Sequence, residues 1–161
     1  MPWHKPYTPA HNQRLDPVLY TLPGHVCFIT IRAYRNQLPF RCESLCQMVI
    51  SVLKEEQAHW NCVVYTYCLM PDHLHFLVSV AEEGASVLVF TERFKGKTTN
   101  ASWKSGWQGK LWQPRYYDHV IRKEESLVKI AQYILDNPVR KGLCASAEDW
   151  PWGGCLNPLP L

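Results

Sequence analysis

The sequence predicts an α+β domain built on a ferredoxin-like antiparallel sheet, with helices on one face and an additional C-terminal helix. The main observation is the order of local patterns, which runs strand, helix, strand, strand, helix, strand and then a further helix. The length of 161 residues suits a single domain, and a hydrophobic content of 47% is enough for an ordinary core. The second face of the sheet is expected to stay partly open.

The first half of the chain supplies three strands and one helix. Residues 25–33 (HVCFITIRA) and 62–68 (CVVYTYC) are dense in β-branched and aromatic residues, as is typical of strands. Between them, apolar residues recur at helical spacing through residues 41–60, which indicates an amphipathic helix. Residues 72–80 form the third strand, and the short connection at Met70-Pro71 predicts a hairpin with the second.

The second half begins with a helix and ends in an irregular segment. Apolar residues at helical spacing predict a helix over residues 86–99, followed by a loop over residues 100–109. Alternation through residues 116–122 (YYDHVIR) predicts the fourth strand. After residue 143 no regular pattern is present, and Trp150-Pro151-Trp152 is expected to cover an edge of the core.

The last helix and the two ends of the chain complete the organisation. The helix is expected to open at Glu124-Glu125-Ser126, because acidic residues favour the positive end of a helix, and to stop before Pro138. Residues 1–23 are rich in proline and polar residues and are expected to form an extended or poorly ordered arm. The domain itself is assigned to residues 24–152, and residues 153–161 to a C-terminal tail.

The composition also bears on where the protein works. No apolar core of a signal peptide follows Met1, and no apolar run of 18 residues is present, so no membrane span is expected. The seven cysteines are an odd number, which favours reduced thiols in an intracellular, cytoplasmic protein.

Positive charge is concentrated in one segment. The formal net charge is only +3, yet residues 84–123 carry eight basic side chains against two acidic ones. Such a local excess favours a polyanionic partner, although a solvated basic face is the alternative. Aromatic residues interleave with the cations, a combination that stacks unpaired bases and holds phosphates, or else forms a hydrophobic cap. The predicted DNA-binding residues are Arg93, Lys95, Lys97, Lys104, Trp107, Lys110 and Arg115.

Two histidines stand at the head of the third predicted strand. Successive strand residues point to opposite faces, so His73 and His75 project from the same face. Two imidazoles on one rigid strand face can bind a divalent metal with open coordination positions. The alternative is a half-buried strand whose two histidines are simply solvated.

The last predicted helix has two distinct stripes. An apolar arc faces the core, while Lys129, Tyr133 and Asn137 follow one another at intervals of four residues on a separate stripe. A tyrosine at the rim of the core, with its hydroxyl reaching solvent, is the alternative explanation.

Three sequence blocks together resemble a known family. They are residues 70–78 (MPDHLHFLV), 112–122 (WQPRYYDHVIR) and 133–140 (YILDNPVR). In this order they closely resemble the REP-associated tyrosine transposases, relatives of the single-tyrosine HUH transposases of small insertion sequences. The resemblance runs from about residue 25 to residue 152.

The resemblance implies an enzyme that nicks single-stranded DNA near hairpins and joins itself to the 5′ phosphate. It implies that His73 and His75 bind the metal, that Tyr133 is the nucleophile, and that Asn137 takes the place of a metal-binding glutamine. Asp118 and His119 belong to a block of the family and are possible accessory residues. The relatives work as monomers or as dimers.

Elementary chemistry agrees with this assignment. Imidazole tolerates Mn²⁺, while oxygen ligands suit Mg²⁺, so either ion is expected as the cofactor. A nearby metal or the cation of Lys129 would favour the phenolate of Tyr133. Tyr116 and Tyr117 are rival nucleophiles, and their position on the predicted strand is better explained by packing or base stacking.

The leading hypothesis is a metal-dependent DNA strand transferase with a tyrosine nucleophile. The main alternative is a non-catalytic module that binds single-stranded nucleic acid on the same fold. A third possibility is a metal-dependent hydrolase of nucleotides, which would need neither the tyrosine nor the basic segment.

Overall fold

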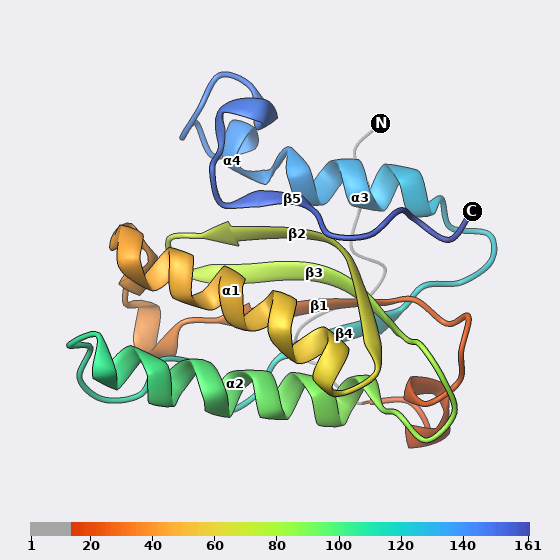
Figure 1. Cartoon of the computed structure of the whole chain (residues 1–161). Helices are drawn as coiled ribbons and strands as arrows, with labels where there is room; N and C mark the ends of the chain where they lie inside the picture. Colours follow the sequence, from red (N-terminus) through yellow and green to blue (C-terminus); the bar gives the residue numbers. More distant parts are fainter. Residues whose placement is uncertain (1–13) are drawn as a thin grey trace.

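The computed structural model describes residues 14–161, and its centre is a five-stranded antiparallel sheet (Figure 1). The strands are β1 (Cys27–Arg32), β2 (Cys62–Met70), β3 (His73–Val80), β4 (Tyr117–Val120) and β5 (Gly153–Cys155). Their order across the sheet is β4-β1-β3-β2-β5. The first four strands therefore have the predicted ferredoxin-like arrangement, which is confirmed.

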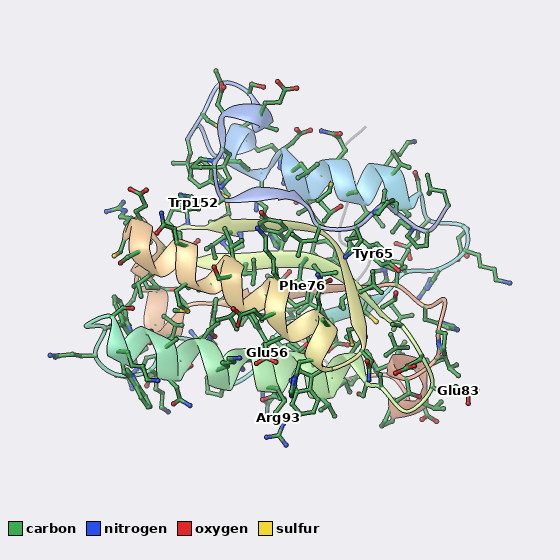
Figure 2. The ribbon with its side chains drawn as sticks, viewed as in Figure 1. Glu56, Tyr65, Phe76, Glu83, Arg93 and Trp152 are labelled. Carbon is green, nitrogen blue, oxygen red and sulfur yellow. The ribbon has the colours of Figure 1, made fainter. Side chains whose placement is uncertain are left out.

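Two long helices cover one face of the sheet. These are α1 (Glu43–His59) and α2 (Val87–Lys104), which lie side by side in front of the strands in Figure 1. Alternate residues of β3 point toward them, and Phe76 contributes to this main core at the position labelled in Figure 2. The local reason is the alternation of the strands, which sends every second side chain to the same layer.

A third helix lies on the opposite face. Helix α3 (Leu127–Leu135) buries Ile130, Ala131 and Ile134 against Phe28 and Leu77 of the sheet in a second, smaller core. This is the face that sequence analysis leaves partly open, and α3 covers part of it. His73 and His75 belong to the same face because they alternate with the residues of the main core.

The sequence explains how α2 and α3 begin. Ser86 and Ser126 are the N-caps, and their side chains accept hydrogen bonds from the backbone amides of Val89 and Lys129. Each cap satisfies one of the amides that have no partner inside the helix.

The end of the last helix differs from the prediction. Helix α3 stops at Leu135, and a further turn, α4 (Asn137–Arg140), follows with Pro138 in its first positions. Proline is tolerated there because its missing N–H would have no helical partner. The break places Asn137 at the start of a new turn.

Three other predictions about the local structure are wrong. Helix α2 continues through Lys104, so much of the expected loop over residues 100–109 is helical. Part of the expected extended arm is a short 3-10 helix, Pro17–Tyr20, with the Tyr20 side chain buried. The expected tail contains β5, which pairs with β2. Residues 1–13 of the arm lie outside the described part of the chain.

The irregular C-terminal segment closes the edge of the sheet as expected. Trp150 donates its indole N–H to the carbonyl of Leu69 at 3.0 Å, and the backbone amide of Leu69 donates to the carbonyl of Trp152 at 2.8 Å. Trp152, labelled in Figure 2, packs against the main core. Over residues 14–161, no helix has the length and hydropathy needed to cross a bilayer.

Candidate active site

His73 and His75 form a close pair on β3. Their ring centroids are 4.6 Å apart at an interplanar angle of 75°, and only 5% and 6% of the two residues is exposed. Two buried imidazoles in contact are not the solvated histidines of the alternative explanation. The two rings therefore lie together in a buried position on this face of the sheet.

Each imidazole is oriented by a hydrogen bond at Nδ1. His73 Nδ1 lies 2.7 Å from Asp72 Oδ1, and His75 Nδ1 lies 2.8 Å from the hydroxyl of Thr30 on β1. The hydrogen bond from His73 also holds the pKa of Asp72 below its usual value. Partners of this kind select the tautomer and fix the ring orientation of metal-binding histidines.

Asn137 lies directly beside the histidine pair. It is 4% exposed, and its side-chain Nδ2 lies 3.1 Å from His73 Nε2. Turning the amide about its last bond exchanges nitrogen for oxygen, which would present Oδ1 at the same place. Over the described part of the chain, no three His, Cys, Asp or Glu side chains form a group that could hold a metal ion. Two imidazole nitrogens and an amide oxygen fit a divalent cation.

The histidine pair opens into a cavity of about 350 Å³, here called the histidine cavity. Tyr133 on α3 lines it together with Asn137, so the helix brings the predicted nucleophile to the predicted metal ligands. Three cationic side chains, Arg32, Arg41 and Lys141, line the same cavity.

The sequence analysis did not identify these three cations. For Arg32 a signal was present, because it is the cation that ends an apolar, strand-like run. Arg41 ends the short 3-10 helix Pro39–Arg41, and Lys141 is the C-cap of α4; the sequence does not reveal that both lie beside the histidine pair.

Arg140 holds Tyr133 from the side of α4. Its guanidinium lies 3.7 Å from the centre of the Tyr133 ring, and its Nη1 donates to the backbone carbonyl of Tyr133 at 2.7 Å. A cation over an aromatic face is attracted by the ring quadrupole. Lys129, one turn before Tyr133, is exposed and does not line the histidine cavity.

The two rival tyrosines differ in their surroundings. Tyr116 is 3% exposed within the main core, and burial raises the pKa of its hydroxyl to about 12. A buried phenol that ionises this reluctantly is a poor nucleophile. Tyr117 pairs with Thr30 across β1 and β4 and lines a neighbouring cavity rather than the histidine cavity.

Asp118 and His119 make structural contacts in the described part of the chain. The Asp118 carboxylate accepts from the Tyr20 hydroxyl at 2.5 Å and pairs with Arg14 at 2.8 Å, so it anchors residues of the arm to β4. His119 Nε2 lies 2.9 Å from Glu125 Oε1. Neither residue lines the histidine cavity.

The basic residues of α2 have different environments. Lys95 is 8% exposed and donates to the carbonyls of Gln113 and Pro114 at 2.9 Å each, so its ammonium supports a loop. Lys97 pairs with Glu56 of α1 at 3.1 Å, which raises its pKa. Arg93 stands over the Trp60 ring at 5.3 Å and extends outward in Figure 2. These side chains belong to the helical layer opposite the histidine pair.

The segment after α2 forms both a cap and an exposed surface. Trp107 packs against the main core and donates to the carbonyl of Lys110, as the hydrophobic-cap alternative requires. Trp103, by contrast, is 52% exposed. Lys104 and Lys110 are exposed, and the Lys110 ammonium stands 5.2 Å from the centre of the Tyr34 ring.

Among the predicted DNA-binding residues, Arg115 lines a cavity next to the histidine cavity. It is exposed and lines the neighbouring cavity together with Arg32, which also lines the histidine cavity. Arg115 therefore shares a cavity with Arg32 but does not line the histidine cavity.

Comparison with known families gives one match over most of the chain. The family described as "Transposase IS200 like" matches residues 20–137. This range includes the histidine pair, Tyr133 and Asn137.

Individual relatives point the same way. A REP-associated tyrosine transposase of Escherichia coli is 26% identical over 136 residues, which cover 83% of this chain and 78% of that protein. A Haemophilus influenzae protein assigned by name to the same group is 26% identical over 112 residues, covering 63% of this chain and 64% of the relative. The alignment thus spans slightly less than two thirds of the Haemophilus protein.

A solved structure shares the fold. It is a REP-associated tyrosine transposase bound to a REP hairpin, with a TM-score of 0.70 and 23% sequence identity. The match covers 83% of this chain and 78% of that one.

Proposed function

The chain belongs to the IS200-like transposase family, and we propose that it cleaves and rejoins single-stranded DNA beside hairpins through a covalent 5′-phosphotyrosine. The observation that carries the proposal is the meeting of Tyr133, Asn137 and the two histidines in one cavity. Its relatives are named as REP-associated tyrosine transposases, and a solved one is bound to a REP hairpin. A DNA hairpin with an unpaired flank is therefore the proposed substrate.

We propose that His73, His75 and Asn137 hold a divalent cation, Mg²⁺ or Mn²⁺. The support is the pair of Nδ1 hydrogen bonds to Asp72 and Thr30, because partners of this kind orient metal-binding histidines whose Nε2 atoms face the ion. Such an ion, when bound, draws charge from the phosphate oxygens and stabilises the transition state.

In the proposed reaction the Tyr133 hydroxyl oxygen attacks the phosphorus atom of the DNA backbone. A bond forms between this oxygen and phosphorus, and the bond from phosphorus to the 3′ oxygen breaks. The phenol loses its proton to solvent, and the departing oxygen gains one to become a free 3′ hydroxyl. No water attacks phosphorus, so the products are a covalent adduct and a free end.

The charge of the histidine cavity suits this step. A phosphodiester resists attack because its anionic oxygens repel an incoming nucleophile, and positive groups near them lower the barrier. Arg32, Arg41 and Lys141 supply three cations around the cavity. Arg140 keeps the Tyr133 ring in place from the other side.

The same covalent adduct explains how the cut DNA can be joined to another DNA end. The phosphotyrosine bond retains the energy of the broken phosphodiester, so a 3′ hydroxyl from another DNA end can attack it and release Tyr133. This exchange needs no nucleotide cofactor. Because its relatives are bacterial proteins and its proposed substrate is DNA, the protein is proposed to act in the cytoplasm.

The experiment is to incubate the purified protein with a labelled hairpin oligonucleotide and Mn²⁺. We expect a protein–DNA adduct that survives denaturation, and His73→Ala or His75→Ala should abolish it while hairpin binding is largely kept, because phosphate contacts dominate affinity. A mobility shift without an adduct would instead support the non-catalytic module. Two free DNA products without an adduct would support a hydrolase.

A further inference from the structure

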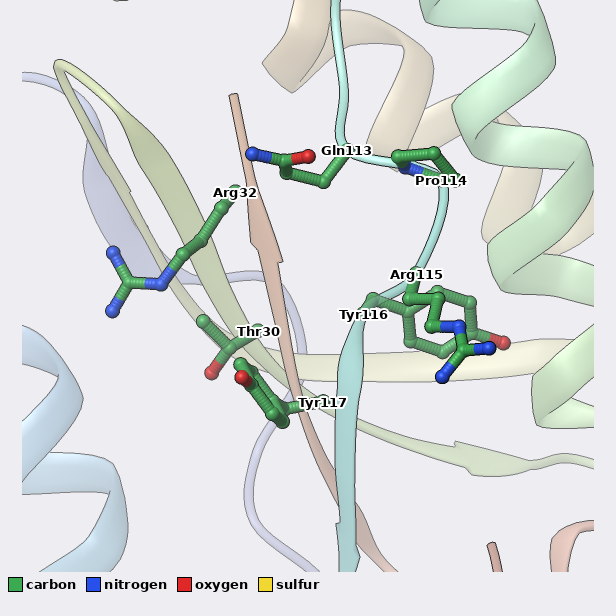
Figure 3. A pocket seen from close by; sticks show the side chains of 7 residues that line it. All are labelled: Thr30, Arg32, Gln113, Pro114, Arg115, Tyr116 and Tyr117. Atoms are coloured by element: carbon green, nitrogen blue, oxygen red, sulfur yellow. The ribbon is translucent and has the colours of Figure 1, made fainter. Parts of the chain in front are cut away.

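A second cavity of about 460 Å³ lies beside the histidine cavity, at the edge where β1 meets β4 (Figure 3). Arg32, Gln113, Arg115 and Tyr117 line it, with Thr30 at its floor. It is called the edge cavity here. Its volume falls in the range of about 300–1,000 Å³ that is typical of small-ligand sites.

The edge cavity is physically joined to the catalytic centre. The hydroxyl of Thr30, which lines the edge cavity, lies 2.8 Å from His75 Nδ1. Arg32 lines both cavities. A molecule in the edge cavity therefore sits one side chain away from the proposed metal ligands.

The side chains of the edge cavity match the parts of a nucleotide. Gln113 offers both donors and an acceptor, which can pair with the edge of a base. Tyr117 presents an aromatic ring, on which an unpaired base can stack. Arg32 and Arg115 offer guanidinium groups that bind phosphate oxygens in pairs. In Figure 3 the Gln113 and Arg32 side chains lie on the same side of the cavity, and Tyr117 lies next to Thr30.

The wall that carries Gln113 is held in place by the rest of the fold. Its backbone amide donates to the carbonyl of Arg32 at 2.8 Å, and the buried Lys95 ammonium binds the carbonyls of Gln113 and Pro114. A bridge between Ala33 and Trp112 secures the residue before it. A site formed in advance loses less entropy on binding.

We propose that the edge cavity binds one unpaired nucleotide next to the cleaved phosphate, with its base against Tyr117 and Gln113 and its phosphate near Arg32. The inference rests on the proposed function, since it gives that reaction its local base preference. A base held here fixes which phosphate enters the histidine cavity, and so it sets the position of the cut.

The test uses the Tyr133→Phe protein, which cannot form an adduct, and hairpin oligonucleotides with one abasic site moved through the unpaired flank. We expect one position at which the abasic site weakens binding by about 5- to 100-fold, the size of a lost stacking contact. In Gln113→Ala and in Tyr117→Ala, the penalty at that position should shrink to about twofold, with the other penalties unchanged.

Gln47→Ala, an exposed glutamine on α1, is the matched control and should keep the full penalty. Gln113→Glu should alter which base is preferred at that position, because a carboxylate cannot donate. The inference would be overturned if Gln113→Ala and Tyr117→Ala both showed the same abasic-site penalties as the parent protein. It would also be overturned if these variants altered binding only to the hairpin stem. Adduct formation by the unmodified protein is measured separately. If the adduct forms but the Gln113 and Tyr117 variants keep the full abasic-site penalty, only the inference about the edge cavity is refuted. If no adduct forms, the proposed function is refuted.

Discussion

Replacing Thr30 by valine should weaken metal binding while leaving the sheet intact. Thr30 is 4% exposed on β1, and its hydroxyl lies 2.8 Å from His75 Nδ1. Valine has nearly the same shape and a comparable strand preference, so the substitution removes essentially one hydroxyl. The change tests whether the partner of His75 prepares that ring for a cation.

The magnitude follows from the hydrogen bond that is lost. A metal on His75 Nε2 requires the proton on Nδ1, and in the variant this buried N–H has no hydroxyl to accept it. An orphaned buried donor costs about 1–3 kcal/mol, part of which the metal-free protein also bears. We therefore expect Mn²⁺ to bind about 5- to 30-fold more weakly, which overlaps the range for lost outer partners of metal ligands.

The assay is calorimetric titration of the metal-free protein with Mn²⁺, together with thermal unfolding in the absence of metal. Thr66→Val is the matched control, since Thr66 is fully buried on β2 and its hydroxyl contacts the Cys155 thiol instead of a histidine. It should keep wild-type Mn²⁺ affinity. A folded Thr30→Val protein that binds Mn²⁺ within twofold of wild type would refute the reasoning.

Three further predictions concern the nucleophile, the basic residues and the arginine beside the nucleophile. Tyr133→Phe should form no covalent adduct on denaturing gels, while its free energy of unfolding changes by no more than about 1–1.5 kcal/mol. Tyr116→Phe should still form the adduct. A DNA-linked peptide that maps to Tyr116 would reassign the nucleophile. Lys95→Met should lower the free energy of unfolding by about 1–3 kcal/mol, because two backbone carbonyls lose their charged donor. Lys110→Met should change the free energy of unfolding by no more than about 0.5 kcal/mol. It should instead reduce the salt dependence of DNA binding by about one unit of slope or less. The opposite pattern in urea unfolding and salt titrations would place Lys95 on the DNA. Arg140→Ala should slow adduct formation with little change in the KM for DNA, and Arg140→Lys should restore part of the rate; a wild-type rate in Arg140→Ala would show that the stacked guanidinium does not position Tyr133.

The sequence alone determined the elements whose periodicity is local. The helix predicted over residues 41–60 is Glu43–His59 in the structure, and the strand predicted over residues 72–80 is His73–Val80. Both carry a regular spacing of apolar residues that no long-range contact has to supply. The projection of His73 and His75 from one face followed in the same way from the two-residue repeat of a strand.

Elements without such a pattern depended on tertiary contacts. Strand β5 is formed by Gly153, Gly154 and Cys155, which have little intrinsic preference for a strand, and it exists because β2 offers an unpaired edge. The position of Lys95 also depended on tertiary contacts, because its charge alone indicated an exposed site on the surface. Its burial beneath the loop of Gln113 depends on where that loop returns to the sheet.

In the candidate site, too, some features were predictable from the sequence and others depended on tertiary packing. Sequence spacing predicted Tyr133 and Asn137 on one side of a single helix, whereas in the structure Tyr133 is in α3 and Asn137 begins α4; the resemblance to a family gave them roles. Only the tertiary structure decided that this helix packs on the face of the sheet that carries His73, at a separation of 64 residues from Asn137 along the chain. Apolar burial of α3 against β2 and β3 sets that docking, while the pairing of β1 with β3 places Arg32 at the same cavity. Packing between distant segments depends on the summed burial of many side chains, which no short motif encodes.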